Sequence, residues 1–410
     1  MMENRFVYCD ALIDGEWAAA DDGGRFAITN PADGSHLTEV ADCGPAEATR
    51  AVEAAARAFP NWAATPAHVR SGLLREWHDR LVANADDLAR VLTAEMGKPF
   101  QEARTEVLYG AAYIEWFAEE AKRIYGEVIP STANDRRMIV IKQPVGVCAA
   151  ITPWNFPNAM LARKAGAALA AGCTMVAKPA EDTPLSALAM AQLALDAGIP
   201  AGVLNVLPTS RPAGVGGVLT SHELVRKLSF TGSTQTGRLL LEQAASTVKK
   251  VSMELGGNAP FIICEDADLE AAAAGFMASK YRNAGQTCIS SNRVFVHESR
   301  IEEFSALIRP RIENLQVARG DSAGSDIGPL INEAAIAKVE RLVTDSLAAG
   351  AQLQLGGARH DAGALFYQPT LISEVAADMP LAREEIFGPV TALIPFASEQ
   401  EVIAMANDTS

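Results

Sequence analysis

Short apolar runs alternate with helical segments between residues 146 and 229, and this alternation constrains the fold more than any other feature. The expected strands are Val147–Thr152, Thr174–Lys178, Val203–Leu207 and Leu224–Ser229, and the expected helices are Asn158–Ala171 and Ser186–Ala197. Strands separated by helices pair in parallel, and the helices cover the faces of the sheet. The sequence therefore predicts an α/β fold.

A second region of the same kind begins after Asn258. Its expected strands are Ala259–Cys264 and Asn292–His297. Its expected helices are Leu269–Arg282, Glu302–Leu315 and Asn332–Ala349. A chain of 410 residues has room for two or three domains at about 150 residues each. We expect two α/β domains that meet near residues 252–258.

The chain before residue 146 has a different pattern. Short β-like runs and turns lead to Gly44, and helical spacing follows in a run that ends at Pro60 and in the stretches Val69–Met96 and Glu102–Ala121. Residues 122–144 predict a β-hairpin between helices. Two interpretations of this hairpin are equally open, an ordinary surface hairpin and an oligomer contact.

Composition excludes several classes of protein. Hydrophobic residues make up 49% of the chain and charged residues 21%, which excludes disorder, collagen and coiled coil. The formal net charge of −15 disfavours binding to nucleic acid or to anionic membranes. The first 17 residues contain no uninterrupted apolar core of a signal peptide, and the stretch 165–177 is too short to span a membrane. We expect a cytoplasmic protein.

The cysteines and histidines do not predict a metal site. The six cysteines are sparse and form no C-x-x-C pair, and the six histidines are scattered. We therefore expect no bound metal and no disulfide framework.

The segment FTGSTQTG (residues 230–237) lies between an expected strand and a helical run. A turn of Gly, Ser and Thr that opens a helix offers backbone N–H groups and a positive dipole end to a phosphate. The segment is not G-x-G-x-x-G, and Arg238-Leu239 stands where a P-loop requires Lys and Ser/Thr. Phosphate binding and a plain turn both remain open.

Three further residues are candidates for chemistry. Cys288 lies among Gly, Gln, Thr and Ser, which is not the composition of a core and suits a thiolate nucleophile. Glu254, beside apolar residues and two glycines, is either a partly buried general base or a solvated carboxylate. Asn155 lies between two prolines, which either direct its amide at an oxyanion or form a plain turn.

Together, these motifs resemble the aldehyde dehydrogenase superfamily. The resemblance runs from about Ile13 to the last residue and rests on six ordered motifs: PWNFP (153–157), KPAEDTP (178–184), FTGSTQTG (230–237), MELGGNAP (253–260), GQTC (285–288) and EEIFGPV (384–390). Residues 158–164 and 280–288 are most similar to the succinate-semialdehyde dehydrogenases. The resemblance implies a Rossmann-like NAD(P)-binding domain (1–121 and 145–254), an oligomerisation hairpin (122–144) and a catalytic α/β domain (255–410). It also implies a homodimer or homotetramer.

The resemblance assigns roles to particular residues. It implies Cys288 as the nucleophile that forms a thiohemiacetal and then a thioester, Asn155 as the oxyanion donor, and Glu254 as the base for hydrolysis. It implies Arg163 and Arg282 as the groups that bind the substrate's distal carboxylate. The implied cofactor contacts are Thr152, Pro153, Trp154, Lys178, Glu181, Gly232, Ser233, Leu255, Glu385 and Phe387. A carboxylate at Glu181 accepts hydrogen bonds from a 2′-hydroxyl and repels a 2′-phosphate, so we expect NAD, with NADP possible.

Three alternatives accompany this expectation. Glutarate semialdehyde rivals succinate semialdehyde as the substrate, and a CoA-acylating dehydrogenase is disfavoured by Glu254. Family members continue well past residue 410, so we expect the catalytic domain to lack its last part. That expectation leaves open an inactive relative that only binds the cofactor.

Overall fold

The computed structural model of the protein describes residues 4–409, which form two compact units. The first unit comprises the chain up to Ile28, His36–Leu92 and Arg104–Leu255. The second comprises Thr29–Ser35, Thr93–Ala103 and the chain from Gly256 onward.

A seven-stranded sheet forms the centre of the first unit. In spatial order its strands are β11 (Lys250–Glu254), β10 (Val225–Thr231), β7 (Val147–Ile151), β8 (Thr174–Lys178), β9 (Leu204–Val206), β1 (Ala11–Ile13) and β2 (Glu16–Ala18). The five strands from β11 to β9 are parallel, whereas β1 and β2 add antiparallel strands at one edge. Every residue of β7 and β8 is buried, as expected for strands with helices on both faces.

Two layers of helices enclose this sheet. The layer of α1, α7 and α8 contacts β7–β11, and the layer of α5 and α6 contacts β7–β9 and is itself covered by α2. The helices of the unit are α1 (Pro45–Ala64), α2 (Ala67–Ala83), α5 (Pro157–Ala170), α6 (Pro184–Asp196), α7 (Pro212–Ser221) and α8 (Thr234–Ala245). Helices α3 (Ala85–Met96) and α4 (Phe100–Glu120) contain residues of both units. A 3-10 turn follows α4 at Ala121–Arg123, and β3 (Arg25–Thr29) pairs with β4 (His36–Ala41).

Helix α1 corrects one sequence prediction, because it continues through Pro60 to Ala64. Proline removes one backbone donor and usually interrupts a helix. Here the residues beyond it are held by tertiary contacts, since Trp62 is buried and its indole N–H donates to the Leu169 carbonyl at 3.2 Å. The predicted helix Val69–Met96 is also two helices, which are separated at Asn84.

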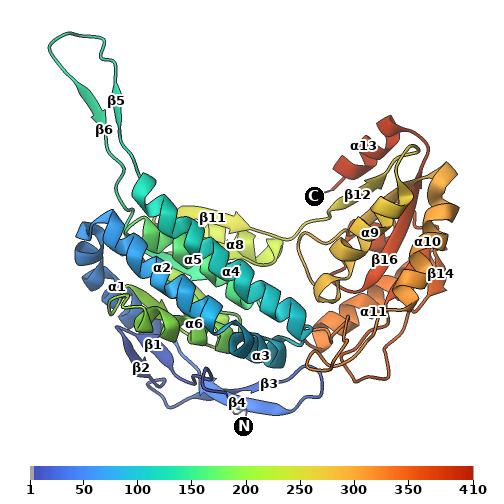
Figure 1. The fold of residues 1–410 in the computed structure, drawn as a ribbon, viewed down its shortest axis with the longest axis horizontal. Helices are drawn as coiled ribbons and strands as arrows, with labels where there is room; N and C mark the ends of the chain where they lie inside the picture. Colours follow the sequence, from blue (N-terminus) through green and yellow to red (C-terminus); the bar gives the residue numbers. More distant parts are fainter. Residues whose placement is uncertain (1–3, 410) are drawn as a thin grey trace. The chain divides into compact units, whose positions relative to one another are not determined.

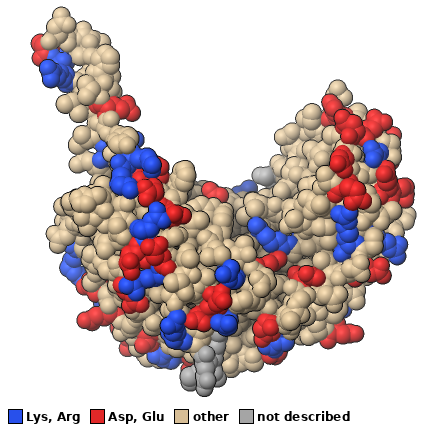
Figure 2. Space-filling model, viewed as in Figure 1, with Lys and Arg blue, Asp and Glu red and all other residues tan. Residues whose placement is uncertain are grey.

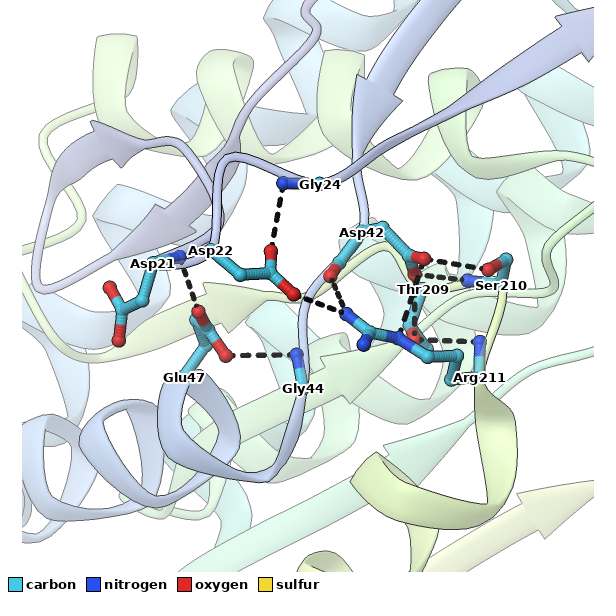
Figure 3. A network of polar contacts seen from close by, with 9 residues as sticks. All are labelled: Asp21, Asp22, Gly24, Asp42, Gly44, Glu47, Thr209, Ser210 and Arg211. Carbon is cyan, nitrogen blue, oxygen red and sulfur yellow. Dashed lines mark hydrogen bonds and ion pairs between the residues drawn. The ribbon is translucent and has the colours of Figure 1, made fainter.

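A polar network joins the start of α1 to the loop after β9 (Figure 3). The Asp42 carboxylate accepts hydrogen bonds from the Ser210 backbone N–H and hydroxyl, both at 2.8 Å, and from the Thr209 hydroxyl at 3.3 Å. Arg211 donates to the Asp22 carboxylate at 3.3 Å and to the Asp42 carbonyl at 2.7 Å. These contacts attach Asp22 and Asp42, which lie in the chain before α1, to the loop that follows β9.

A hairpin of β5 (Glu127–Ile129) and β6 (Met138–Val140) extends away from the helices of the first unit (Figure 1). All six strand residues are exposed, including Val128 at 76% and Ile139 at 67%. Figure 2 shows few charged side chains on the face of the hairpin that it presents. The predicted hairpin is therefore present. Its strands expose mainly apolar side chains, whereas its turn carries Asp135, Arg136 and Arg137.

The second unit contains a five-stranded sheet. Its spatial order is β12 (Pro260–Ile263), β13 (Arg293–His297), β16 (Val390–Phe396), β15 (Thr370–Ser373) and β14 (Gln352–Leu355), with only β14 antiparallel. The helices are α9 (Leu269–Lys280), α10 (Ile301–Glu313), α11 (Glu333–Ala348), α12 (Pro380–Arg383) and α13 (Glu399–Asn407), and 3-10 turns lie at Arg282–Gly285 and Glu298–Arg300. Buried side chains such as Phe276, Phe304 and Leu393 form one core between sheet and helices.

The α/β fold class is confirmed in both units. The sequence predicted many of the elements before residue 350 to within a few residues. It did not predict β11 or α7, nor β14, β15, α12, β16 and α13 at the end of the chain. Among residues 4–409, no helix combines the length and apolar character needed to cross a membrane.

Glu47 provides a test of how the first unit is stabilised. Its buried carboxylate accepts the Gly44 N–H at 2.8 Å and the Asp21 N–H at 2.6 Å. Glu47→Ala removes the charged acceptor of these two backbone N–H groups. It should therefore lower the free energy of unfolding by about 2 kcal/mol or more. We expect the thermal midpoint to fall by at least about 4 °C. Glu53→Ala, an exposed site on the same helix, is the control, and equal midpoints for the two variants would contradict this role.

Candidate functional site

The carboxyl ends of four parallel strands lie side by side in the first unit. The pairing places Ile151 of β7 opposite Lys178 of β8 and opposite Phe230 of β10, and it places Thr231 opposite Glu254 of β11. Ligands of open parallel sheets bind outside the carboxyl ends of the strands. The register therefore brings the predicted residues Thr152, Lys178, Gly232 and Glu254 to one edge of the sheet, although they are far apart in sequence.

The turn from β10 to α8 has the features of a phosphate site. Ser233 is the N-cap of α8, and its hydroxyl oxygen accepts the Thr236 N–H at 3.2 Å. Gly232 donates its N–H to the Glu254 carbonyl at 3.0 Å, and a Cβ at this position would lie 2.5 Å from the Phe230 ring. A helix N-terminus preceded by a glycine turn presents backbone donors and a positive dipole end to an anion.

Lys178 and Glu181 follow the end of β8. The Lys178 side chain is almost fully buried, and its Nζ lies 3.2 Å from the carboxylate of exposed Glu181 and donates to the Pro179 carbonyl at 3.1 Å. Thr152 donates its N–H to the Lys178 carbonyl at 3.1 Å. This edge therefore presents a cation paired with a carboxylate, which suits recognition of hydroxyl groups.

The segment Pro153–Pro157 connects β7 to α5, and Pro157 occupies the first turn of that helix. Asn155 is buried, whereas Pro153 and Trp154 are partly exposed. The N-terminus of α5 is capped by a residue that the sequence did not reveal, because the buried Glu106 carboxylate accepts the N–H groups of Asn158 at 3.0 Å and Ala159 at 3.2 Å.

Glu254 ends β11 and is exposed, so its surroundings correspond to the solvated carboxylate rather than to the partly buried acid. A second group near it was not predicted. Buried Lys164 of α5 donates to the Ser229 hydroxyl at 3.0 Å, and burial lowers its pKa to about 8 although Glu254 acts in the opposite direction. Lys164 and Glu254 are brought close by the pairing of β10 and β11, so no local sequence pattern indicates that they interact.

Arg163 of α5 is held by two tyrosines of α4. Its Nη2 donates to the Tyr113 hydroxyl at 2.5 Å and to the Tyr109 hydroxyl at 3.1 Å, and its guanidinium lies 4.6 Å from the Tyr113 ring centroid. Within residues 4–409, no hydrogen-bond acceptor reaches its buried Nε. No carboxylate is among these partners, so the arginine charge remains available for an external anion.

Cys288 lies in the second unit and is exposed. The residues before it adopt an uncommon conformation, since Asn283, Ala284 and Gly285 have φ of 54°, 54° and 75°. The left-handed region costs an ordinary L-residue about 1–2 kcal/mol, and Ala284 has no side-chain polar group to offset this cost. Such strain persists only where the surroundings determine the backbone.

Several contacts fix this loop. A Cβ on Gly285 would lie 2.2 Å from the Gly388 carbonyl oxygen, so the loop packs directly on the EEIFGPV segment. The buried Gln286 side chain accepts the Ile331 N–H at 3.0 Å and donates to the Asn283 carbonyl at 3.2 Å. Arg282, at the start of the loop, is exposed.

The EEIFGPV segment carries Glu385 and Phe387. Burial raises the pKa of Glu385, whose carboxylate accepts the Gly257 N–H at 3.4 Å. Phe387 has a φ of 57°, and buried Asn292 holds the segment by accepting the Ile386 N–H at 2.8 Å. The predicted residues of the second unit therefore lie on two loops in contact. Among the described residues no cluster of His, Cys, Asp or Glu is suited to a metal ion.

Comparison with known proteins finds relatives along almost the whole chain. The model of the aldehyde dehydrogenase family matches residues 17–410. The chain is 53% identical to the NADP(+) succinate-semialdehyde dehydrogenase of Escherichia coli, over 97% of this chain and 83% of the relative. It is also 53% identical to a 3-sulfolactaldehyde dehydrogenase of Pseudomonas putida (97% and 82%) and 51% identical to a glutarate-semialdehyde dehydrogenase of Pseudomonas aeruginosa (97% and 82%). The crystal structure of succinate-semialdehyde dehydrogenase from Burkholderia pseudomallei superposes with a TM-score of 0.98 at 52% identity, covering 100% of this chain and 85% of that one.

Lys280 ends α9 directly before the Cys288 loop, and it generates a prediction about pH. Burial lowers its pKa from 10.5 to about 7. Between these two values the unfolded chain keeps a proton that the folded chain has lost, so the free energy of unfolding rises with pH by about 1.4 kcal/mol per unit. Lys280→Met removes this dependence.

We therefore expect the thermal midpoint of the wild type, relative to Lys280→Met, to rise between pH 7 and pH 10 and to level off below pH 7. Scanning calorimetry at fixed ionic strength measures it. Exposed Lys122→Met is the matched control and should show a constant difference. A constant difference for Lys280→Met as well would contradict the assignment.

Proposed function

The chain belongs to the aldehyde dehydrogenase family, and on this premise we propose that it oxidises succinate semialdehyde to succinate with NAD(P). The observation that carries the choice of substrate is Arg163. Two tyrosine hydroxyls orient its guanidinium without neutralising it. A fixed cation of this kind favours an aldehyde with a distal anionic group over an uncharged one.

NAD(P) supplies the hydride acceptor. Backbone donors at Gly232 and Ser233, on the N-terminus of α8, would bind its pyrophosphate, and Lys178 and Glu181 would bind the adenosine ribose. Thr152, Pro153, Trp154 and Leu255 would line the same sheet edge, and Glu385 and Phe387 would contact the nicotinamide side. Glu181 favours a 2′-hydroxyl, whereas Lys178 suits a 2′-phosphate and the E. coli relative is named for NADP(+). Both cofactors therefore enter the test.

Cys288 is the proposed nucleophile. Its thiolate attacks the aldehyde carbon, and the oxyanion that forms accepts hydrogen bonds from the Asn155 amide and the Cys288 backbone N–H. Loss of hydride from the resulting thiohemiacetal leaves a thioester on the cysteine. Exposure of Cys288 and the fixed loop before it support this role.

Glu254 is the proposed base for hydrolysis. Its carboxylate takes a proton from a water molecule, the hydroxide adds to the thioester carbon, and the Cys288 thiolate leaves. An exposed carboxylate has access to water, which supports this role. A base for water also argues against CoA as the acyl acceptor.

Glutarate semialdehyde is the second candidate substrate, because it carries the same distal carboxylate one methylene further away. The P. aeruginosa relative is named for it, and the P. putida relative is named for an aldehyde that carries a sulfonate. A pocket distinguishes one methylene by only about 10–200-fold. The ratio of kcat/KM for the two semialdehydes therefore decides between them.

Two features concern the whole protein in the cell. We propose that the exposed apolar hairpin Glu127–Val140 packs on a second copy of the chain, as a homodimer or homotetramer would require. All six cysteines of the chain are outside disulfides, which supports the reducing cytoplasm as its location.

The test of the activity is reduction of NAD and of NADP with succinate semialdehyde, followed at 340 nm. We expect turnover in the wild type and none above background in Cys288→Ala, because no other group supplies the thioester. Cys264→Ala, at a partly buried position, is the matched control and should keep wild-type turnover. Activity that survives Cys288→Ala, or a folded wild type that binds the cofactor without turnover, would contradict the proposal.

A second test addresses the substrate's anionic group. Arg163→Met should lower kcat/KM for succinate semialdehyde by about 100-fold, since a charged hydrogen bond contributes about 1.5–3 kcal/mol. The value for butanal, which lacks the carboxylate, should change by less than about threefold. Equal losses for both aldehydes would show that Arg163 does not read the anionic group.

A further inference from the structure

We propose that Glu102 is a positioning residue for the Cys288 nucleophile, which it fixes by holding the left-handed loop before the cysteine. This inference rests on the proposed function, because it assumes that Cys288 attacks the substrate. Glu102 lies in the first turn of α4, far from Cys288 in sequence, and no catalytic role for it followed from the sequence motifs.

Glu102 contacts the loop through a hydrogen bond to its first left-handed residue. The Glu102 carboxylate Oε2 accepts the N–H of Asn283 at 2.8 Å, and Asn283 is the first of the three residues with positive φ. A carboxylate that accepts a backbone N–H forms a charge-assisted bond, which is stronger and more directional than a neutral one. Glu102 therefore acts where the chain leaves α9 and turns into the loop.

The charges around Glu102 suit an ionised carboxylate. Lys98 and Arg282 lie near it and favour the charged form, while Asp326 opposes it. Burial raises the pKa of Glu102, so these cations and the Asn283 N–H offset part of the cost of burying the charge.

The loop is attached on both sides of Ala284, and Glu102 supplies an attachment on the upstream side. The downstream one is the contact of Gly285 with the Gly388 carbonyl, together with the bond from Ile331 to Gln286. Ala284 lies between them in the left-handed region, which alanine rarely adopts. When the hydrogen bond to Glu102 is removed, Ala284 can relax toward ordinary backbone angles. The thiol of Cys288, two residues beyond Gln286, then moves.

The first experiment compares Glu102→Ala, Glu102→Gln and the control Glu302→Ala, an exposed site on α10. We expect kcat with succinate semialdehyde to fall by about 100-fold in Glu102→Ala, because a displacement of about 1 Å at a reacting atom has this effect. The Kd for NADP should change by less than about twofold. Glu102→Gln retains an oxygen that accepts the Asn283 N–H and should keep at least about a third of wild-type kcat, and Glu302→Ala should match the wild type.

The second experiment separates positioning from general stability. Glycine adopts the left-handed region without strain, so Ala284→Gly supplies by backbone preference what Glu102 supplies by its hydrogen bond. We expect Glu102→Ala to lower kcat at least about fivefold less in the Ala284→Gly background than in the wild type, which is the signature of two coupled residues. If Glu102→Ala alone does not fold, Ala284→Gly should restore a folded, cofactor-binding protein.

Three outcomes would overturn the proposal. The first is a kcat of Glu102→Ala within twofold of the wild type. The second is equal losses in the two backgrounds, or no restoration by Ala284→Gly of a variant that fails to fold. The third is a Glu102→Gln variant as inactive as Glu102→Ala, since a role of the charge alone would then replace the hydrogen bond. Failure of the proposed function itself would appear differently, as activity that survives Cys288→Ala.

Discussion

The parallel pairing of β7, β8, β10 and β11 is the constraint on which the proposed cofactor site depends. Each strand contributes a different motif, and none of these motifs forms a site alone. Pairing places Ile151, Lys178 and Phe230 at corresponding heights and Thr231 opposite Glu254, so the segments that follow these strands emerge at one edge. A helix dipole, a buried lysine and a carboxylate are thereby combined from four segments of the chain.

Buried and partly buried glutamates provide a second, recurring device. Glu47 accepts N–H groups at the start of α1, Glu106 accepts those at the start of α5, and Glu102 accepts the N–H of Asn283. In each case a carboxylate satisfies backbone donors that regular secondary structure leaves without partners. The cost of burying a charge is offset by stronger hydrogen bonds, and the segment that is held gains a defined direction.

The limits of sequence reasoning are clearest at particular residues. Pro60 indicated a helix end, but the burial of Trp62 carries α1 past it. Strand β11 was not predicted, because its residues are largely exposed at the edge of the sheet and lack a continuous apolar run. The sequence neighbours of Glu254 do not show whether its carboxylate is buried or solvated. The position of β11 at the edge of the sheet leaves it exposed.

The sequence by itself determined the α/β class and many helices and strands, and it predicted the reactive residue types, because periodicity and short motifs are local properties. The tertiary structure alone decided which groups act on one another. The orientation of Arg163 by Tyr109 and Tyr113, and the attachment of Asn283 to Glu102, join residues that are 50 or more positions apart in the printed sequence. Contacts of this kind depend on how helices and loops pack, and no local pattern in the chain encodes them.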